Sequence, residues 1–159
     1  EGVGPAYAVA VRLHPFMRGK GLYAGFADLS GEDLVKTLCA ADILVTDYSS
    51  VIFEYAALNR PMLFLTPDLE DYAQKRGFYR DFRSFVPGKI CFSERELVRA
   101  VRAGDFETHK VAAFAAEHLE HRDALSTQRV CALIHCVMQG IPPAADRFAA
   151  IGRGAPVSG

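Results

Sequence analysis

The sequence predicts an α/β protein with a Rossmann-like fold, in which helices flank a mostly parallel sheet. Short apolar runs at residues 6–13, 43–46 and 62–65 are typical of strands, and helical patterns separate them. The run at 43–46 is apolar without alternation, as in strands that are covered on both faces. Strands that alternate with helices indicate βαβ units, whose ligands bind beyond the carboxyl ends of the strands. The residues that follow each strand are therefore the first candidates for function.

The composition fits one globular domain of ordinary size. The chain has 159 residues, 50% of them hydrophobic, and 18 Lys+Arg against 19 Asp+Glu give a formal net charge of −1. Nucleic-acid binders usually carry a basic surface, so nucleic acid is not an expected partner. No apolar run approaches the about 20 residues that a transmembrane helix needs. We expect one domain over residues 1–140 and a disordered tail over 141–159, where small residues, glycine and proline prevail.

The first half of the predicted domain contains three strands and two helices. Proline after His14 ends the strand at 6–13, and the segment 16–29 is expected to be a loop. Ser30 with Asp33 resembles a capping box and predicts a helix that begins there. That helix would bury Leu34, Val35 and Leu38. A second helix, 51–58, lies between the strands at 43–46 and 62–65, and Asn59-Arg60-Pro61 ends it.

Helices dominate the second half. Residues 67–88 show no regular pattern, and 90–92 are typical of a short strand. Ser93 with Glu96 forms a second capping box, which predicts a helix through Val101. Further helices are expected over 107–121 and from Ser126 to Gly140. Helical spacing of apolar residues in the last helix predicts that one face packs inward: Val130, Leu133, Ile134, Val137 and Met138.

The cysteines and histidines predict no metal site. No CxxC pair and no zinc-type spacing occurs among Cys39, Cys91, Cys131 and Cys136, so all four are expected to be free and buried. His118 and His121 share a helix face without a third ligand to complete a site, and a solvated polar face explains them. The chain begins with Glu1 and shows no signal-peptide pattern. We therefore expect a fragment or a processed product, on the cytoplasmic side.

A polar segment follows the strand at 43–46 and precedes a helix: Asp47, Tyr48, Ser49 and Ser50. Backbone N–H groups, hydroxyls and the positive end of a helix dipole favour a bound phosphate at such a position. Capping of the helix explains the same residues, because Ser and Asp are preferred N-caps, and the residues alone leave both interpretations open. Glu54 lies one turn later, either as an orienting carboxylate or as a solvated residue.

Two other polar groups are candidates for the same site. His14 follows a strand, where it can orient a phosphate or transfer a proton near neutral pH, and Arg12 leaves the same face. Ser126 and Thr127 can cap the last helix, and Arg129 can reach back over its opening turn. Hydrogen bonding at the edge of the core, or ordinary capping, explains each group equally well. Arginines near the third strand add positive potential or are plain surface charges: Arg60, Arg76, Arg80 and Arg83.

The run from Ala41 to Pro61, ADILVTDYSSVIFEYAALNRP, strongly resembles the signature of the CDP-glycerol:poly(glycerophosphate) glycerophosphotransferases, the teichoic-acid polymerase family. Glu54 takes the place of a common Asp there. Further similar segments follow in the family order over about residues 9–137: Leu13-His14-Pro15, Asp68 to Tyr72, Arg76 to Tyr79, Pro87-Gly88 and Asp123 to Val130. Ala124 stands where the family usually has glycine, which restricts the loop if that position needs a positive φ.

The resemblance implies the C-terminal half of a GT-B fold, which holds most of the nucleotide donor, and an N-terminal acceptor domain that this chain lacks. It implies a catalytic role for His14 beside the donor pyrophosphate. The substrate-binding candidates are then Arg12, Asp47, Tyr48, Ser49, Ser50, Glu54, Arg60, Ser126, Thr127 and Arg129.

The implied reaction moves glycerol phosphate from CDP-glycerol to a hydroxyl of a growing teichoic-acid-type polymer and releases CMP. Such a step depends mostly on positioning and on charge stabilisation of the phosphoryl group. No permanently bound cofactor and no metal-ligating residue are predicted, and whether the reaction depends on a metal stays open. Ribitol phosphate is an alternative group, and the full-length protein is expected at the inner face of the cell membrane. Two other interpretations stay open: a GT-B nucleotide-sugar transferase or epimerase, and a non-catalytic nucleotide-binding domain.

Overall fold

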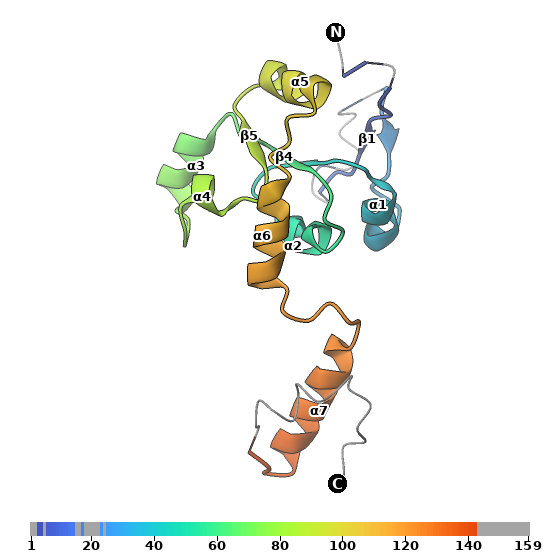
Figure 1. The fold of residues 1–159 in the computed structure, drawn as a ribbon, viewed down its shortest axis with the longest axis vertical. Helices are drawn as coiled ribbons and strands as arrows, with labels where there is room; N and C mark the ends of the chain where they lie inside the picture. The colour runs from blue at the N-terminus through green and yellow to red at the C-terminus, as the bar shows by residue number, and fades with distance from the viewer. Residues whose placement is uncertain (1–2, 5, 15–16, 18–22, 24, 143–159) are drawn as a thin grey trace. The chain divides into compact units, whose positions relative to one another are not determined.

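The computed structural model describes residues 3–4, 6–14, 17, 23 and 25–142 (Figure 1). The chain forms two compact units, residues 1–118 and residues 119–159. The second unit contains the helix α7 (Ser126–Met138). The first unit holds the other elements in this order: β1 (Ala10–Val11), β2 (Ala27–Asp28), α1 (Leu34–Ala40), β3 (Leu44–Thr46), α2 (Val51–Ala56), β4 (Met62–Leu65), α3 (Leu69–Arg76), α4 (Phe82–Phe85), β5 (Lys89–Cys91), α5 (Glu94–Ala103) and α6 (His109–His118).

All paired strands of the first unit run parallel, which confirms the predicted fold class. β3, β4 and β5 form one sheet with β4 in the middle, and β1 pairs with β2 in a second sheet. Leu44 of β3 lies opposite Met62 of β4, and Leu63 of β4 lies opposite Lys89 of β5. The carboxyl ends of β3 and β4 therefore meet at one edge of the sheet, where Asp47 and Asp68 follow them.

The centre of the core is β4. Met62, Leu63 and Phe64 are each 0% exposed, as the unbroken apolar run predicted, and Leu63 packs with Cys91 and the inner face of α5. Gly88 passes so close to this strand that a Cβ atom there would lie 2.2 Å from the carbonyl oxygen of Met62. Only glycine fits that approach, because neither backbone can move without breaking the sheet.

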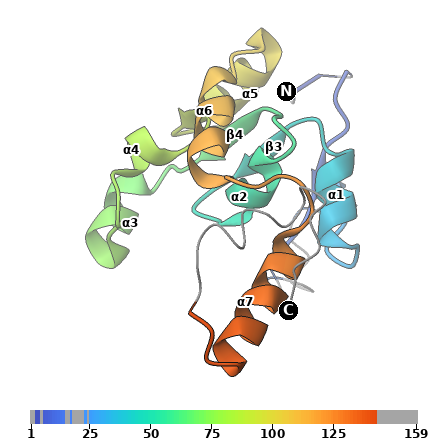
Figure 2. The same cartoon turned by 60° about the horizontal axis from the view of Figure 1, so that its bottom comes forward.

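Helix α6 packs against α2 through aromatic rings. Phe114 of α6 lies 5.2 Å from the Phe53 ring of α2, and His118 stacks on Phe114 at 4.2 Å. Figures 1 and 2 both show α6 beside α2. His118 is therefore a packing residue of α6, in place of the solvated position that its spacing with His121 predicted.

The N-terminal elements differ from the sequence-based expectations. β1 contains two residues of the expected strand 6–13, and the expected loop 16–29 contains β2. The predicted cap at Ser30 is wrong: α1 begins four residues later, and the Asp33 carboxylate accepts the N–H of Lys36 at 2.9 Å. Ser30 is buried instead, because its Oγ accepts the N–H of Leu13 at 2.8 Å. Val35, predicted to be buried, is 65% exposed.

The structure corrects some predictions and confirms others in the second half. The segment 67–88 contains α3 and α4, whose short lengths gave no periodic signal, and α6 is shorter than 107–121. The capping box of α5 is confirmed, since the N–H of Glu96 donates to Ser93 Oγ, while Glu96 itself accepts the N–H of Phe92 at 2.7 Å. Gly140, expected to end the last helix, has a φ of 66°.

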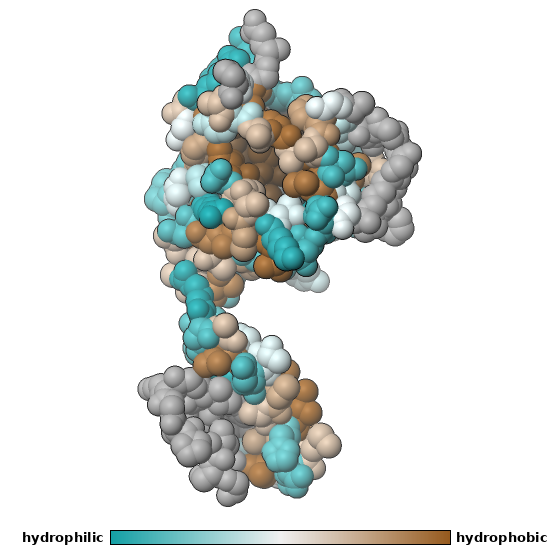
Figure 3. Space-filling model, turned by 90° about the vertical axis from the view of Figure 1, so that its right-hand side faces the viewer, coloured by the Kyte–Doolittle hydropathy of each residue, from teal (hydrophilic) through white to brown (hydrophobic). Residues whose placement is uncertain are grey.

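The apolar face of α7 is exposed, contrary to prediction. Ile134 is 54% exposed and Met138 is 77% exposed, because α7 is the only helix described within its unit. Figure 3 shows brown, apolar side chains on the surface of this segment. Cys39 and Cys131 are likewise exposed rather than buried, whereas Cys91 and Cys136 are buried. Most of the expected tail, residues 143–159, lies outside the described residues.

Candidate functional site

The polar segment Asp47–Ser50 forms the turn between β3 and α2, which we call the β3–α2 turn. Ser49 Oγ accepts the N–H of Val51 at 3.3 Å, so Ser49 contributes the capping contact that the sequence suggested. Ser50 occupies the N-cap position without a side-chain capping bond. Its hydroxyl is therefore available to a ligand, and the Ser49 hydroxyl can still donate its hydrogen while its oxygen accepts.

Acidic side chains flank these hydroxyls. Asp47 precedes them, Glu54 lies in the first turn of α2, and both are exposed. Within the described residues neither carboxylate makes a hydrogen bond or an ion pair with the protein. Carboxylates accept hydrogen bonds from hydroxyl groups, and serine hydroxyls donate to phosphate oxygens. The β3–α2 turn therefore offers donors and acceptors to a ligand that carries both phosphate and hydroxyl groups.

Tyr48 anchors the β3–α2 turn to the neighbouring strand end. Its hydroxyl donates to Asp68 Oδ1 at 2.8 Å, just after β4. Its ring stacks on Tyr72 with centroids 3.8 Å apart and meets Phe82 edge-on at 5.3 Å. These contacts direct Tyr48 toward α3 and α4, so its role in the site is to hold the backbone of the turn.

The environment of Tyr48 keeps its hydroxyl protonated. Burial, the hydrogen bond to Asp68 and the nearby charges of Asp68 and Asp47 all raise the pKa of Tyr48 well above its usual value. A neutral hydroxyl remains a donor to Asp68 throughout the physiological range. Near neutral pH the Tyr48 hydroxyl therefore keeps the proton that it donates to the end of the neighbouring strand.

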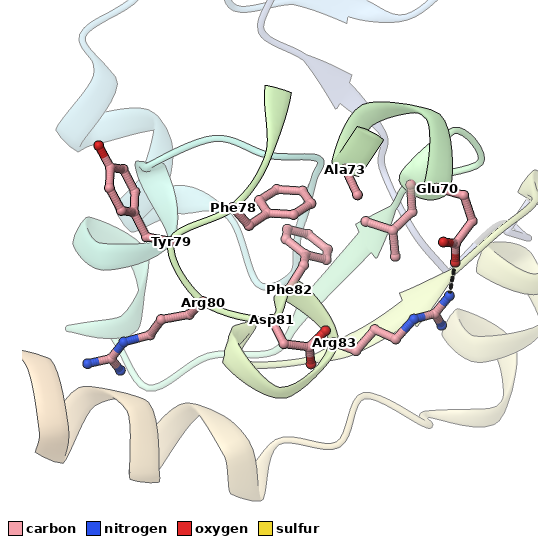
Figure 4. A pocket seen from close by; sticks show the side chains of 9 residues that line it. Glu70, Ala73, Phe78, Tyr79, Arg80, Asp81, Phe82 and Arg83 are labelled. Atoms are coloured by element: carbon pink, nitrogen blue, oxygen red, sulfur yellow. Dashed lines mark hydrogen bonds and ion pairs between the residues drawn. The ribbon is translucent and has the colours of Figure 1, made fainter. Parts of the chain in front are cut away.

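The ring cluster around Tyr48 borders a pocket between α3 and α4. The pocket has a volume of about 290 Å³, and Leu69, Phe78 and Phe82 contribute its apolar surface. Figure 4 shows the Phe78 and Phe82 rings side by side and the ion pair between Glu70 and Arg83 at the rim. Because both phenylalanine rings also contact Tyr48, the pocket adjoins the β3–α2 turn.

His14 and Arg12 lie at the end of β1. His14 is exposed, and its carbonyl accepts the N–H of Met17 at 2.8 Å. The N–H of the preceding residue, Leu13, donates to Ser30 Oγ at 2.8 Å. Arg12 Nη1 donates to the carbonyls of Leu29 and Glu32 at 2.9 and 2.6 Å. Arg12 therefore links the end of β1, two residues before His14, to the segment ahead of α1.

Arg60 does not join the β3–α2 turn. Its Nη1 donates to the carbonyls of Cys39 and Ala41, each at 2.7 Å, at the carboxyl end of α1. Arg60 precedes β4 and so lies at the amino edge of the sheet, opposite the β3–α2 turn. The prediction that Arg60 binds substrate is therefore not carried forward, because these bonds give it a structural role.

Ser126, Thr127 and Arg129 belong to the second unit. Ser126 and Thr127 are the first residues of α7, and the cap position is Leu125, which has no side-chain bond, so the expectation that they cap the helix is wrong. Arg129 does reach back over the opening turn, where its guanidinium pairs with both oxygens of Asp123. This pairing, with a bond from the N–H of Leu125, holds the pKa of Asp123 well below its usual value.

Ala124 is strained in the way that its family comparison suggested. Its φ is 59°, in the left-handed region that glycine tolerates and alanine disfavours. The loop between Asp123 and α7 therefore requires the conformation that glycine adopts without strain.

Sequence reasoning missed Asp68, Ser30 and the aromatic rings around Tyr48. The signal that points to Asp68 is its place directly after β4, since the carboxyl ends of neighbouring parallel strands meet. Nothing local identifies Ser30 as an acceptor for Leu13. Within the described part of the chain, no three His, Cys, Asp or Glu side chains gather into a group that could hold a metal ion. Every described helix also falls short of the length and apolar character that crossing a bilayer requires.

Residues 1–136 match the family model described as "CDP-Glycerol:Poly(glycerophosphate) glycerophosphotransferase". The chain is 40% identical over 134 residues to the teichoic acid ribitol-phosphate primase of Bacillus spizizenii, a match that covers 80% of this chain and 34% of that protein. It is 37% identical over 128 residues to the teichoic acid glycerol-phosphate primase of Bacillus subtilis, covering 78% of this chain and 33% of that protein. The chain thus spans about one third of the length of these relatives.

The fold is similar to that of the wall teichoic acid polymerase TagF. The superposition has a TM-score of 0.66 at 28% sequence identity and covers 84% of this chain and 35% of the TagF chain. A TagF variant soaked with CDPG superposes with the same TM-score of 0.66. The likeness in structure and the likeness in sequence therefore indicate the same group of proteins.

Proposed function

Because this chain belongs to the CDP-glycerol:poly(glycerophosphate) glycerophosphotransferase family, we propose that it is the donor-binding part of an enzyme that transfers an alditol phosphate to a teichoic-acid-type polymer. The donor is a CDP-alditol, CDP-glycerol in the first place, and CMP is released. The acceptor is a hydroxyl of the growing polymer, and an acceptor-binding segment outside this chain completes the enzyme. We also propose a peripheral position at the inner face of the cell membrane for the full-length protein.

The observation that carries this proposal is the β3–α2 turn within the family match. The turn presents the hydroxyls of Ser49 and Ser50 at the carboxyl edge of a parallel sheet, where ligands of such folds bind. Asp47 and Glu54 beside them suit the hydroxyl groups of a ribose or an alditol. Helix α2 has only six residues, so the hydroxyls contribute more to this site than the dipole of a short helix.

The proposed reaction is a displacement at the phosphorus that bears the alditol. The acceptor oxygen forms a bond to that phosphorus, the bond to the bridging oxygen breaks, and that oxygen leaves with CMP. Ser49 and Ser50 hold the phosphate oxygens and stabilise the charge that the leaving phosphate gains. His14 takes the proton of the acceptor hydroxyl, and Arg12 ties the preceding strand end to the segment ahead of α1.

Ser126, Thr127 and Arg129 are proposed as a second set of phosphate contacts. The Asp123–Arg129 pair fixes the guanidinium over the first turn of α7, and the two hydroxyls begin the same helix. The family resemblance of the segment Asp123 to Val130 supports this assignment.

Calorimetric titration of the chain with CDP-glycerol, CDP-ribitol and UDP-glucose tests the proposal. We expect binding of a CDP-alditol, and a loss of about tenfold or more in affinity for the Ser49→Ala/Ser50→Ala double variant, because hydrogen bonds to charged groups contribute about 1.5–3 kcal/mol each. Thr108→Ala, which removes an exposed hydroxyl ahead of α6, is the matched control and should bind like the wild type. Circular dichroism checks that each variant is folded.

The donors separate the alternatives. Tighter binding of CDP-ribitol than of CDP-glycerol would assign a ribitol phosphate enzyme, consistent with the 40% identity to a ribitol-phosphate primase. Preference for UDP-glucose would contradict the proposal and favour a nucleotide-sugar enzyme. Unchanged affinity in the double serine variant would remove the β3–α2 turn from the donor site.

A further inference from the structure

The outer face of α5 carries a row of arginines. Arg95, Arg99 and Arg102 follow one another at spacings of four and three residues, and all three are exposed. An open hollow of about 650 Å³ lies along this face, lined by Glu94, Arg95, Val98, Arg99, Arg102 and Ala103. We call these residues the α5 arginine face. Like charges four residues apart destabilise a helix by about 0.2–0.5 kcal/mol, so the row has a local cost.

Most arginines elsewhere in the described part of the chain have protein acceptors, Arg76 and Arg122 being the exceptions. Arg12 and Arg60 bind backbone carbonyls, while acidic side chains pair with Arg80, Arg83 and Arg129. Within the described residues Arg95 and Arg99 have no such hydrogen bond or ion pair. The acidic residues of the same helix offset the face only in part: Glu96 turns back to the N–H of Phe92, and Glu94 is the one carboxylate among the lining residues, against three arginines.

We propose that the α5 arginine face binds the polyanionic poly(alditol phosphate) chain, at a site separate from the β3–α2 turn. This inference rests on the proposed function, which supplies a polymer with one negative charge per repeat. One guanidinium group can donate two parallel hydrogen bonds to the oxygens of a phosphate. The helix places successive arginines about 4.5–6 Å apart along its axis. A flexible chain of phosphodiesters can therefore contact several of them at once.

The face suits a dissolved polyanion better than a membrane surface. A helix that lies on a membrane inserts its large apolar side chains beside the basic ones. In α5 the apolar side is occupied, because Leu97, Ala100 and Val101 pack against the sheet. Val98 and Ala103 are the only apolar residues among the described ones that line the hollow, and both side chains are small. The attraction of this face for a ligand is therefore mainly electrostatic.

Fluorescence anisotropy with a labelled poly(glycerol phosphate) oligomer measures this binding on the whole chain. We expect Arg95→Gln/Arg99→Gln to weaken binding of the oligomer by about tenfold, since each exposed charge pair that is lost contributes about three- to fivefold. The variant should also show a smaller salt dependence of binding. Arg95→Lys/Arg99→Lys should recover part of the affinity, since lysine keeps the charge without the paired geometry. Lys36→Gln/Arg122→Gln removes the same charge from other exposed positions and should bind like the wild type.

Two further arms decide between sources of the phosphate. Vesicles of phosphatidylglycerol and phosphatidylcholine test binding to a membrane surface. If the glutamine variant binds these vesicles more weakly than the wild type does but binds the oligomer equally well, the polymer proposal is overturned. Equal oligomer binding by wild type and glutamine variant, or none by the wild type, also overturns it. Titration of the same variant with CDP-glycerol should be unchanged. Failure of the wild type to bind CDP-glycerol would count against the proposed function. The oligomer assay would still decide whether the α5 arginine face binds a polyanion.

Discussion

The strand β4 and the helix α7 carry comparably regular apolar patterns, yet only β4 is buried. Met62, Leu63 and Phe64 are 0% exposed, whereas Val130 and Ile134 of α7 are each 54% exposed. β4 has a strand on either side and helices against its faces, while α7 is the only described helix of its unit. An apolar pattern thus identifies a face that other residues can bury. It does not predict whether this chain contains the residues that bury it.

The largest expected effect tests this contrast directly. Phe64→Ala should lower the free energy of unfolding by about 4 kcal/mol, since it removes a fully buried ring that also meets Phe82 edge-on. Ile134→Ala in α7 should change it by less than about 0.5 kcal/mol, as exposed substitutions do. Urea denaturation measures both. A cost for Ile134→Ala that approaches the cost for Phe64→Ala would show that α7 is covered in solution.

The next effect concerns the close approach of backbone to β4. Gly88→Ala should destabilise the chain by about 3 kcal/mol, because the new Cβ would lie 2.2 Å from the Met62 carbonyl oxygen. Gly31→Ala is the matched control, since no heavy atom lies within 4 Å of the added Cβ and its φ is not positive. Equal denaturation midpoints for the two variants would contradict the tight packing of residue 88 on β4.

A smaller effect of opposite sign is expected next to α7. Ala124→Gly should stabilise the turn ahead of α7 by about 1 kcal/mol, because glycine adopts a φ of 59° without strain. Hydrogen exchange of the α7 amides reports this local change. Ala112→Gly, at an exposed position within α6, should instead destabilise its helix by about 1 kcal/mol. Faster exchange in α7 of the Ala124→Gly variant would exclude strain at that position.

The smallest effect appears only in alkaline solution. The folded chain raises the pKa of Tyr48 through burial and Asp68, so the stability that this group contributes is present below its unfolded pKa of about 10 and is lost as the pH rises above it. Tyr48→Phe should therefore lose less stability than the wild type between pH 10 and 12. Urea midpoints at several pH values give the two slopes, and parallel slopes would place Tyr48 in solvent.

Much of the fold follows from local patterns. The strands at 43–46 and 62–65, the capped start of α5 and the turn Asp47–Ser50 all lie where the sequence predicts them, because each depends on residues within four positions of one another. α3 and α4 escaped prediction because they are short, with eight and four residues, and carry no extended apolar period. The local patterns left the ligand of the β3–α2 turn open, and the ligand that we propose for it comes from the family resemblance.

The sequence by itself determined the strands at 43–46 and 62–65, the capped start of α5 and the position of the β3–α2 turn, since strand propensity and capping are local. The family resemblance singled out Ala124. Only the tertiary structure decided which polar groups serve the scaffold: Tyr48 bonds Asp68, 20 residues away, Ser30 accepts from Leu13, 17 residues away, and Arg60 donates to Cys39, 21 residues away. It also decided that the apolar face of α7 is exposed and that, within the described residues, Arg95 and Arg99 of α5 have no hydrogen bond or ion pair. These hydrogen bonds depend on which segments of the chain meet in space, and the spacing of residues along the sequence does not predict which segments meet.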